Sequence, residues 1–170
     1  TVFINLENGK NLIEKKLKHS VIRNIKKAIN SGLDFKINDG GDVDDFIMIY
    51  QNAMNRVNAD KYLYFNREYF ENLFKLPSLM TINVNYRNDT IASAVCFSYK
   101  NYFHYHLGAS YTEYLSFRPN DLMFYGMIQA GLSKKCSYLH LGGGNLPLAD
   151  DGLLRFKKKF SNDFGEFYIG

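Results

Sequence analysis

Two strand patterns with glycine at their carboxyl ends, Gly108 in one and Gly142 directly after the other, are the feature that most restricts the fold of this chain. They span residues 102–109 and 136–141, and a helical pattern at 121–135 joins them. A strand–helix–strand connection of this length favours parallel neighbours in one sheet. In open α/β sheets ligands bind beyond the carboxyl ends of such strands. We therefore expect the strand ends at 107–110 (LGAS) and 141–144 (LGGG) to meet at one binding site.

The remaining patterns predict an α/β protein of the α+β type. Strands are expected at 1–6, 33–37, 79–86, 91–99 and 164–169, and helices at 11–31, 43–55, 67–75 and 151–160. The short polar links at 87–89 and 100–101 are typical of antiparallel hairpins. The predicted sheet is therefore mixed and mostly antiparallel, with one parallel pair, and helices flank it. Residues 1–32 would form an N-terminal strand and basic helix in front of a main domain at 33–170, in one compact unit overall.

Composition narrows the class of protein. The 170 residues are 46% hydrophobic and 22% charged, which is typical of one globular domain. No apolar run reaches the ~18 residues that cross a bilayer, and no secretory signal pattern opens the chain. Cys96 and Cys136 lie far apart in apolar contexts, so we expect core thiols in a reducing compartment. These features predict a cytoplasmic location. The chain starts at Thr1, which is compatible with a piece of a longer protein.

The predicted helix at 11–31 has two different faces. Leu17, Val21, Ile25 and Ala28 recur on one side, while the other side is basic. One interpretation is an ordinary solvated face. The other is a stripe that contacts phosphate groups, with Arg23, Lys26 and Lys27 as the candidate residues.

The C-terminal part of the chain carries the candidate chemistry. Gly142, Gly143 and Gly144 would let backbone N–H groups approach a ligand closely. Lys157, next to the apolar Phe156, would hold a positive charge nearby. An anionic or carbonyl-bearing substrate fits this combination, because N–H groups and an ammonium stabilise a developing oxyanion. The alternatives are a tight turn for the glycines and a solvated helix edge for the lysines at 157–159.

Three histidines also lie near the predicted site. His104 and His106 share one face of a strand by alternation, which leaves Phe103, Tyr105 and Leu107 on the other, and His140 lies on the neighbouring strand. Three imidazoles could bind zinc, but no acidic or cysteine ligand is nearby in sequence. We therefore predict no metal site and choose His106 as a candidate catalytic base for an amine.

Several segments resemble one family of transferases. YHLGAS at 105–110, RPNDLMFYGMIQAGLSKK at 118–135, LHLGGG at 139–144 and DGLLRFKKKFS at 151–161 are similar to the FemAB group of the GNAT superfamily. FemAB proteins consist of two GNAT-like halves, and the second half opens with a strand and a basic helix. TVFINL at 1–6 and the helix that carries Arg23 fit this opening. The resemblance covers nearly the whole chain, and the first half is absent from these residues.

The resemblance implies a GNAT fold and the transfer of an acyl or aminoacyl group to an amine. In the peptidoglycan branch, which is bacterial, the donor is aminoacyl-tRNA and the acceptor is a cell-wall precursor. It implies catalysis by Lys157 and a channel shaped by Phe156, with no tightly bound cofactor. We expect the donor to bind at Gly108, Ala109, Ser110, Asn120, Leu141, Gly142, Gly143 and Gly144. We expect the acceptor or tRNA to bind at Arg23, Lys26, Lys27 and Tyr105.

The connection at 111–120 departs from the pattern of GNAT enzymes that use acetyl-CoA. Those enzymes carry a glycine-rich loop for the pyrophosphate, whereas YTEYLSFRPN contains no glycine. This favours aminoacyl-tRNA as the donor. Two alternatives remain: an acetyl-CoA-dependent N-acetyltransferase, for which the helix start near Asn120 would offer N–H groups to an anion, and a non-catalytic half that binds tRNA or a precursor.

Overall fold

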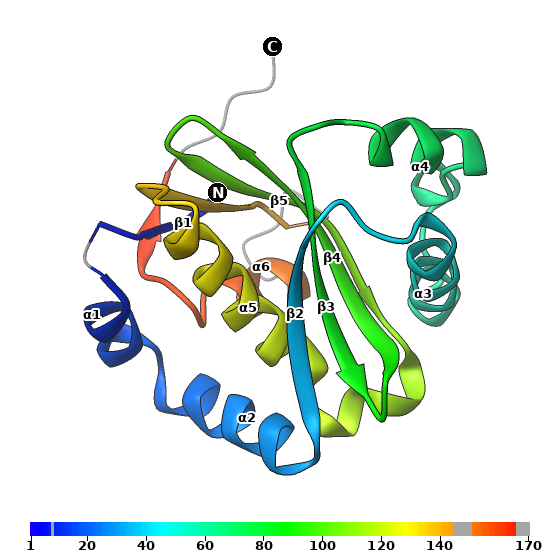
Figure 1. Cartoon of the computed structure of the whole chain (residues 1–170). Helices are drawn as coiled ribbons and strands as arrows, with labels where there is room; N and C mark the ends of the chain where they lie inside the picture. The colour runs from blue at the N-terminus through cyan, green and yellow to red at the C-terminus, as the bar shows by residue number, and fades with distance from the viewer. Residues whose placement is uncertain (8, 145–150, 166–170) are drawn as a thin grey trace.

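The computed structural model describes residues 1–7, 9–144 and 151–165, and one mixed sheet organises them. The described strands are β1 Val2–Asn5, β2 Leu33–Asp39, β3 Leu79–Tyr86, β4 Asp89–Tyr99, β5 Tyr102–Ser110, β6 Tyr138–Gly142 and β7 Asp163–Phe164. Their order in the sheet is β2-β3-β4-β5-β6-β1-β7 (Figure 1). The β5–β6 pair is parallel and every other neighbouring pair is antiparallel. The predicted mixed sheet with one parallel pair is confirmed.

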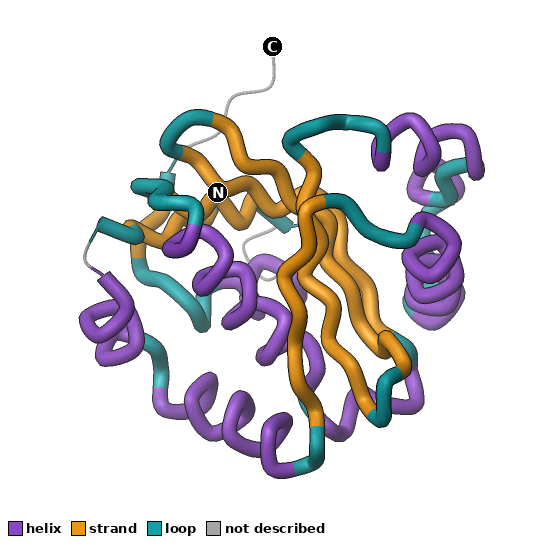
Figure 2. Tube along the Cα trace, viewed as in Figure 1, coloured by secondary structure: helices purple, strands orange, loops and turns teal. Residues whose placement is uncertain are grey.

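Helices cover both faces of this sheet (Figure 2). The described helices are α1 Gly9–Lys16, α2 His19–Asn30, α3 Val43–Arg56, α4 Arg67–Phe74, α5 Pro119–Ser133 and α6 Gly152–Lys157, with short 3-10 helices η1 Lys61–Leu63 and η2 Thr112–Phe117. One core cluster lies between the sheet and α2, α5 and α6, and the other lies beneath α3 and α4. None of the described helices is long and apolar enough to cross a membrane.

Helix α5 is the central element of the larger cluster. It follows Arg118, which has left-handed backbone angles (φ 66°), and starts at Pro119, whose fixed φ suits the first helical position. Its sequence is apolar on almost every side, as expected for a helix enclosed by α2 and the sheet. A Cβ at Gly126 would lie only 2.7 Å from the Ile82 side chain, so glycine allows α5 to lie directly on β3.

The hairpins follow the predicted turns closely. Strand β3 has the predicted bounds, and β4 and β5 differ from theirs by one or two residues. Arg87, Asn88 and Lys100 adopt positive φ angles in the two tight links. These links therefore fix consecutive antiparallel strands β3, β4 and β5.

The N-terminal segment differs from the prediction in one respect. The single helix expected at 11–31 is two helices, because Leu17 is buried in the core and Lys18 is extended (ψ 142°). Strand β1 lies inside the sheet, between β6 and β7. The strand predicted at 164–169 coincides with β7 at Phe164, and its residues 166–169 lie outside the described residues.

Candidate functional site

Strands β5 and β6 separate shortly after they begin. They pair only at Tyr102–Tyr138, Phe103–Leu139 and His104–His140, whereas β5 continues to Ser110 and β6 to Gly142. Beyond His104 the facing edges of the two strands therefore have no partner in the ladder. Backbone N–H and C=O groups seek hydrogen bonds, so these edges can bind a ligand that enters between the strands.

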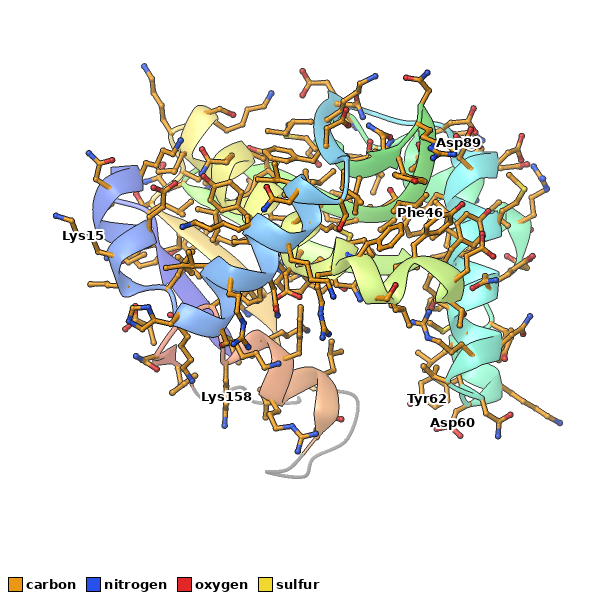
Figure 3. All side chains as sticks on the ribbon, turned by 90° about the horizontal axis from the view of Figure 1, so that it is seen from below. Lys15, Phe46, Asp60, Tyr62, Asp89 and Lys158 are labelled. Atoms are coloured by element: carbon orange, nitrogen blue, oxygen red, sulfur yellow. The ribbon has the colours of Figure 1, made fainter. Side chains whose placement is uncertain are left out.

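A cleft of about 660 Å³ lies at this separation. One wall comes from the end of α3 and from η1, the other from α6, and the floor from β5 and β6. Figure 3, viewed from below, shows Lys158, which follows α6, and Tyr62 of η1 projecting to the same side of the molecule. The described lining residues are Thr1, Tyr50, Ala53, Met54, Arg56, Val57, Leu63, His104, Tyr105, His106, Leu107, Gly108, His140, Leu141, Gly142, Gly143, Gly144, Leu153 and Lys157.

Lys157 is the most enclosed cation in this cleft. Its side chain is 4% exposed, and its Nζ donates a 2.7 Å hydrogen bond to the carbonyl oxygen of Gly143. The Nζ also lies 5.1 Å from the centre of the Tyr105 ring. Burial lowers the pKa of Lys157 to about 8, although the nearby Asp151 charge opposes this. The ammonium therefore loses its proton more easily than an exposed lysine does, which suits a group that both stabilises negative charge and exchanges a proton.

Asp151 fixes the start of the helix that carries this lysine. Its Oδ1 accepts a 2.7 Å hydrogen bond from the N–H of Leu154, as an N-cap does. A Cβ at Gly144 would collide with Asp151, so a glycine lets the strand end approach the helix. The glycines at 142–144 and Lys157 thus form one local unit.

His104 and His140 form a coupled pair on the floor. Their Nδ1 atoms are 2.7 Å apart and their ring planes differ by 16°. One ring must donate and the other accept, so both Nδ1 atoms cannot carry protons in this geometry. Burial, and then the nearby charges of His140, His106 and Lys157, lower the pKa of His104 to about 4. Burial also lowers the pKa of His140. Both rings are therefore neutral at pH 7.

His106 lies beside a bulge in β5. The register between β4 and β5 shifts between Val95 and Cys96, which leaves His106 without a partner in the ladder. Its Nε2 lies 2.8 Å from the Tyr69 hydroxyl of α4. Leu107 consequently packs in the α3–α4 cluster, away from Phe103. The expectation that Phe103 and Leu107 share a face was therefore wrong, because the bulge interrupts the alternation.

The structure brings only part of the predicted site together. Eight of its members line the cleft: Tyr105, His106, Gly108, Leu141, Gly142, Gly143, Gly144 and Lys157. Phe156 instead packs against Phe124 at 5.0 Å between ring centres and is absent from the lining. Ala109 is buried in the α3–α4 cluster, and Ser110 is buried at the end of β5.

The prediction missed Arg56, at the last residue of α3. Its Nη1 donates to the backbone oxygen of Ser110 at 2.8 Å and lies 3.5 Å from Thr112 Oγ1. Burial lowers the pKa of Arg56. In sequence Arg56 is an isolated basic residue at a helix end, and no local pattern connects it with Ser110, which lies 54 residues away.

The first turn of α5 lies apart from the cleft lining. Asn120 belongs to this turn, and the next residue, Asp121, is 4% exposed. Asn24 of α2 donates a 3.1 Å hydrogen bond to Asp121 Oδ1. Burial raises the pKa of Asp121, against the effects of Asn24, Lys159 and Arg118. A carboxyl group of the protein therefore already occupies the start of α5.

The basic residues of α2 line grooves of their own. Lys26 lines two adjacent grooves, with His19 and Ile22 in both, and Arg23 and Lys27 line the second. The Asn24–Asp121 hydrogen bond connects this helix to the start of α5. The predicted nucleic-acid residues thus lie on a different surface from Tyr105. Within residues 1–7, 9–144 and 151–165, no three His, Cys, Asp or Glu side chains are arranged to hold a metal ion.

Comparison with known proteins identifies a family. The model of the acetyltransferase (GNAT) domain family matches residues 15–158. No curated protein sequence matches the chain. A crystal structure of FemX superposes with a TM-score of 0.78 at 14% identity, covering 93% of this chain and 57% of that one. The chain thus spans less than two thirds of FemX.

Two further solved structures share the fold. The structure of L-PGS from Bacillus licheniformis superposes with a TM-score of 0.69 at 14% identity, covering 93% of this chain and 55% of that one. An aminoglycoside acetyltransferase from an uncultured soil metagenomic sample, in complex with sisomicin, gives a TM-score of 0.62 at 13% identity. That match covers 84% of this chain and 98% of the other.

Proposed function

Because the chain belongs to the acetyltransferase (GNAT) domain family and is thus an acyltransferase, we propose that it transfers an aminoacyl group from aminoacyl-tRNA to the amine of a cell-wall precursor. The observation that carries this proposal is the Lys157 ammonium, held against the Gly143 carbonyl where β5 and β6 separate. An acyl carbonyl placed between the strands would have both a buried cation and unpaired backbone groups within the same cleft.

The proposed chemistry is an addition followed by an elimination. The neutral acceptor amine attacks the ester carbonyl of the donor, and a C–N bond forms. Lys157 stabilises the negative charge that develops on the carbonyl oxygen. The C–O bond to the terminal ribose then breaks. The ribose oxygen gains one proton and the amine loses one, and Lys157, with a pKa of about 8, is suited to pass a proton between them.

The start of α5 supports tRNA over coenzyme A as the donor. Helix N-termini bind phosphate through free N–H groups and the helix dipole. Here the buried Asp121 carboxyl occupies the first turn and α2 covers it through Asn24. A pyrophosphate would have to displace or neutralise that carboxyl group. The likeness to FemX and L-PGS over 93% of this chain supports the same proposal at the level of the fold.

We place the tRNA along α2. Arg23, Lys26 and Lys27 lie on the grooved outer surface of this helix. A phosphate backbone bound there would be held by electrostatic attraction, so its affinity should fall steeply with salt. Replacing the three residues with glutamine should weaken tRNA binding and flatten its salt dependence by about two to three ion equivalents. Unchanged salt dependence in this variant would refute the placement.

A transfer assay tests the main proposal. Transfer RNAs charged with radiolabelled amino acids are incubated with the chain and a nucleotide-linked muramyl peptide, and the labelled product is measured. We expect Lys157→Ala to slow transfer by at least about a hundredfold, as expected when a group that stabilises an oxyanion is removed. Lys158→Ala, at the residue that caps the end of the same helix, should transfer at the normal rate. Equal rates in the Lys157 variant and the wild type would refute the role of Lys157.

Acetyl-CoA-dependent transfer is the second candidate. The observation that favours it is that Arg118 and Lys159 lie close enough to Asp121 to lower its pKa, against the effect of burial, so positive charge surrounds the start of α5. Saturating acetyl-CoA should then raise the melting temperature, since a ligand of the native state stabilises it by mass action. A clear rise would replace aminoacyl-tRNA by acetyl-CoA as the donor. Salt-dependent tRNA binding without transfer would instead indicate a non-catalytic half.

A further inference from the structure

Arg56 is a positioned cation on the wall of the cleft opposite Lys157. Its hydrogen bond to the carbonyl of Ser110 ties the end of α3 to the end of β5. A guanidinium carries five N–H donors in a fixed plane. Ser110 O and Thr112 Oγ1 both accept from Nη1, so most of the donors of this guanidinium remain for a ligand.

This guanidinium has no acidic partner among the described residues. The ion pairs there join Lys10 to Glu14, Arg67 to Asp44 and Glu71, and Lys134 to Asp39. Burial is the cause of the lowered pKa of Arg56, and no neighbouring carboxylate offsets it. Arg56 is exposed, and its hydrogen bonds to Ser110 and Thr112 hold its guanidinium at the cleft, where it is accessible to an anion from outside.

The rest of the cleft reinforces the positive charge. Its described lining includes two basic side chains, Arg56 and Lys157, on opposite walls, and contains no Asp or Glu. The nearby Asp151 lies outside that lining and caps α6. A purely cationic acceptor would bring its charge toward two cations. An acceptor that also carries an anionic group can pair that group with Arg56 and keep its amine free.

We infer that the acceptor carries a carboxylate near its reactive amine and that Arg56 binds this carboxylate. This inference rests on the proposed function, because it takes the cleft as the site of acyl transfer. A planar guanidinium matches the two oxygens of a carboxylate. Met54, Val57 and Leu63 beside Arg56 supply apolar surface for the chain between the two groups. The acceptor class is thus an amino acid, or a peptide with a free carboxyl end. The aminoglycoside sisomicin, a polycation without a carboxylate, falls outside this class.

The test measures binding without any donor. Nα-acetyl-L-lysine carries an amine and a carboxylate, and its C-terminal amide is the matched neutral control. Each is titrated into the protein while the side-chain N–H resonance of Arg56 is followed by NMR, with that resonance assigned by its loss in Arg56→Gln. We expect the acid to shift the resonance and to bind about tenfold more tightly than the amide, the difference that one charge-assisted hydrogen bond provides.

Variants then locate the preference. Arg56→Gln should bind the acid and the amide equally, whereas Arg87→Gln, on the β3–β4 hairpin, should keep the tenfold preference. Three results would each overturn the inference. They are no shift of the Arg56 resonance with the acid, equal binding of the acid and the amide by the wild type, and a preference for the acid that remains in Arg56→Gln. If phosphoethanolamine shifts the Arg56 resonance and the acid does not, the anionic group is a phosphate, and the choice of a carboxylate is wrong. The binding test contains no acyl donor, so a failure of the transfer assay would leave its result unchanged. If transfer occurs but the protein binds the acid and the amide equally, only the role of Arg56 in carboxylate binding is refuted, and the proposed function stands.

Discussion

Replacing Lys157 with methionine should make the folded chain more stable at neutral pH while it removes activity. Lys157 is 4% exposed, and burial is the largest cause of its lowered pKa. A buried cation disfavours the folded state unless its interactions offset the lost hydration. Methionine has a similar length and no charge, so the variant keeps the packing against Tyr105 and avoids the cost of desolvation.

The size of the effect follows from the pKa. The pKa falls from its ordinary 10.5 to about 8, and each tenfold change in proton affinity is worth ~1.4 kcal/mol. Keeping Lys157 protonated in the folded state therefore costs roughly 3 kcal/mol at pH 7. The variant loses the hydrogen bond to Gly143, which destabilises it by ~1–2 kcal/mol and offsets part of this gain. The net gain should be about 1–2 kcal/mol, which corresponds to a rise of ~2–8 °C in melting temperature for a chain of this size.

The pH dependence gives the prediction its specific sign. Below pH 8 the lysine is protonated in both the folded and the unfolded state, so the full cost is present. Between pH 8 and 10.5 the unfolded chain binds more protons than the folded chain, so the stability of the wild type rises with pH. The advantage of Lys157→Met should therefore be constant below pH 8, should vanish at about pH 9 and should reverse by about pH 10.5, because the wild type gains ~1.4 kcal/mol per pH unit in this range.

Urea unfolding followed by circular dichroism at pH 7, 8, 9 and 10 measures this difference. The chain contains no Trp, so circular dichroism or tyrosine fluorescence must serve as the probe. Lys158→Met is the matched control, because Lys158 is the next residue and its Nζ lies outside the cleft, 5.2 Å from the centre of the Phe164 ring. A gain that does not change with pH, or a Lys157→Met protein less stable than the wild type at pH 7, would refute the reasoning.

Three other outcomes follow from the structure. Gly126→Ala should lose ~1–3 kcal/mol in urea unfolding because its Cβ would lie 2.7 Å from Ile82, whereas Gly152→Ala, with no atom within 4 Å, should lose nothing. The wild type should lose stability as pH falls from 6.5 to about 4, because His104 binds a proton in the unfolded chain but not in the folded one. In thermal unfolding, the melting temperature of His104→Gln should fall less steeply with pH over this range, and an equally steep fall would contradict the prediction. Tyr69→Phe should lose ~1 kcal/mol of stability, because it removes the hydroxyl that lies 2.8 Å from His106 Nε2, and the imidazole resonances of His106 should shift in the NMR spectrum.

The fold could be predicted because its signals are local. Hydrophobic periodicity located the strands and helices, and the polar links at 87–89 and 100–101 fixed consecutive antiparallel strands. The helix between β5 and β6 was long enough for a crossover, which predicts the parallel pair. Each of these features depends on residues within one element or one turn, so the sequence alone is sufficient to predict it.

The failures arose where distant elements meet. The break at Leu17 depends on burial against the rest of the core, since nothing in the local pattern stops the helix. The bulge at His106 depends on how β4 pairs with β5 and turns Leu107 toward α3 and α4. A one-residue shift of register moves side chains to the other face of a sheet, and alternation alone cannot detect it.

The sequence by itself determined the order of the strands along the chain, the single parallel pair and the meeting of two glycine-bearing strand ends with Lys157. Only the tertiary structure decided that Phe156 packs in the core, that His104 and His140 share a hydrogen bond, and that Arg56 lines the cleft. The physical reason is that propensity and turn chemistry act over a few residues. Distances and charges in a cleft depend on contacts between residues far apart in the chain, such as Arg56 and Ser110.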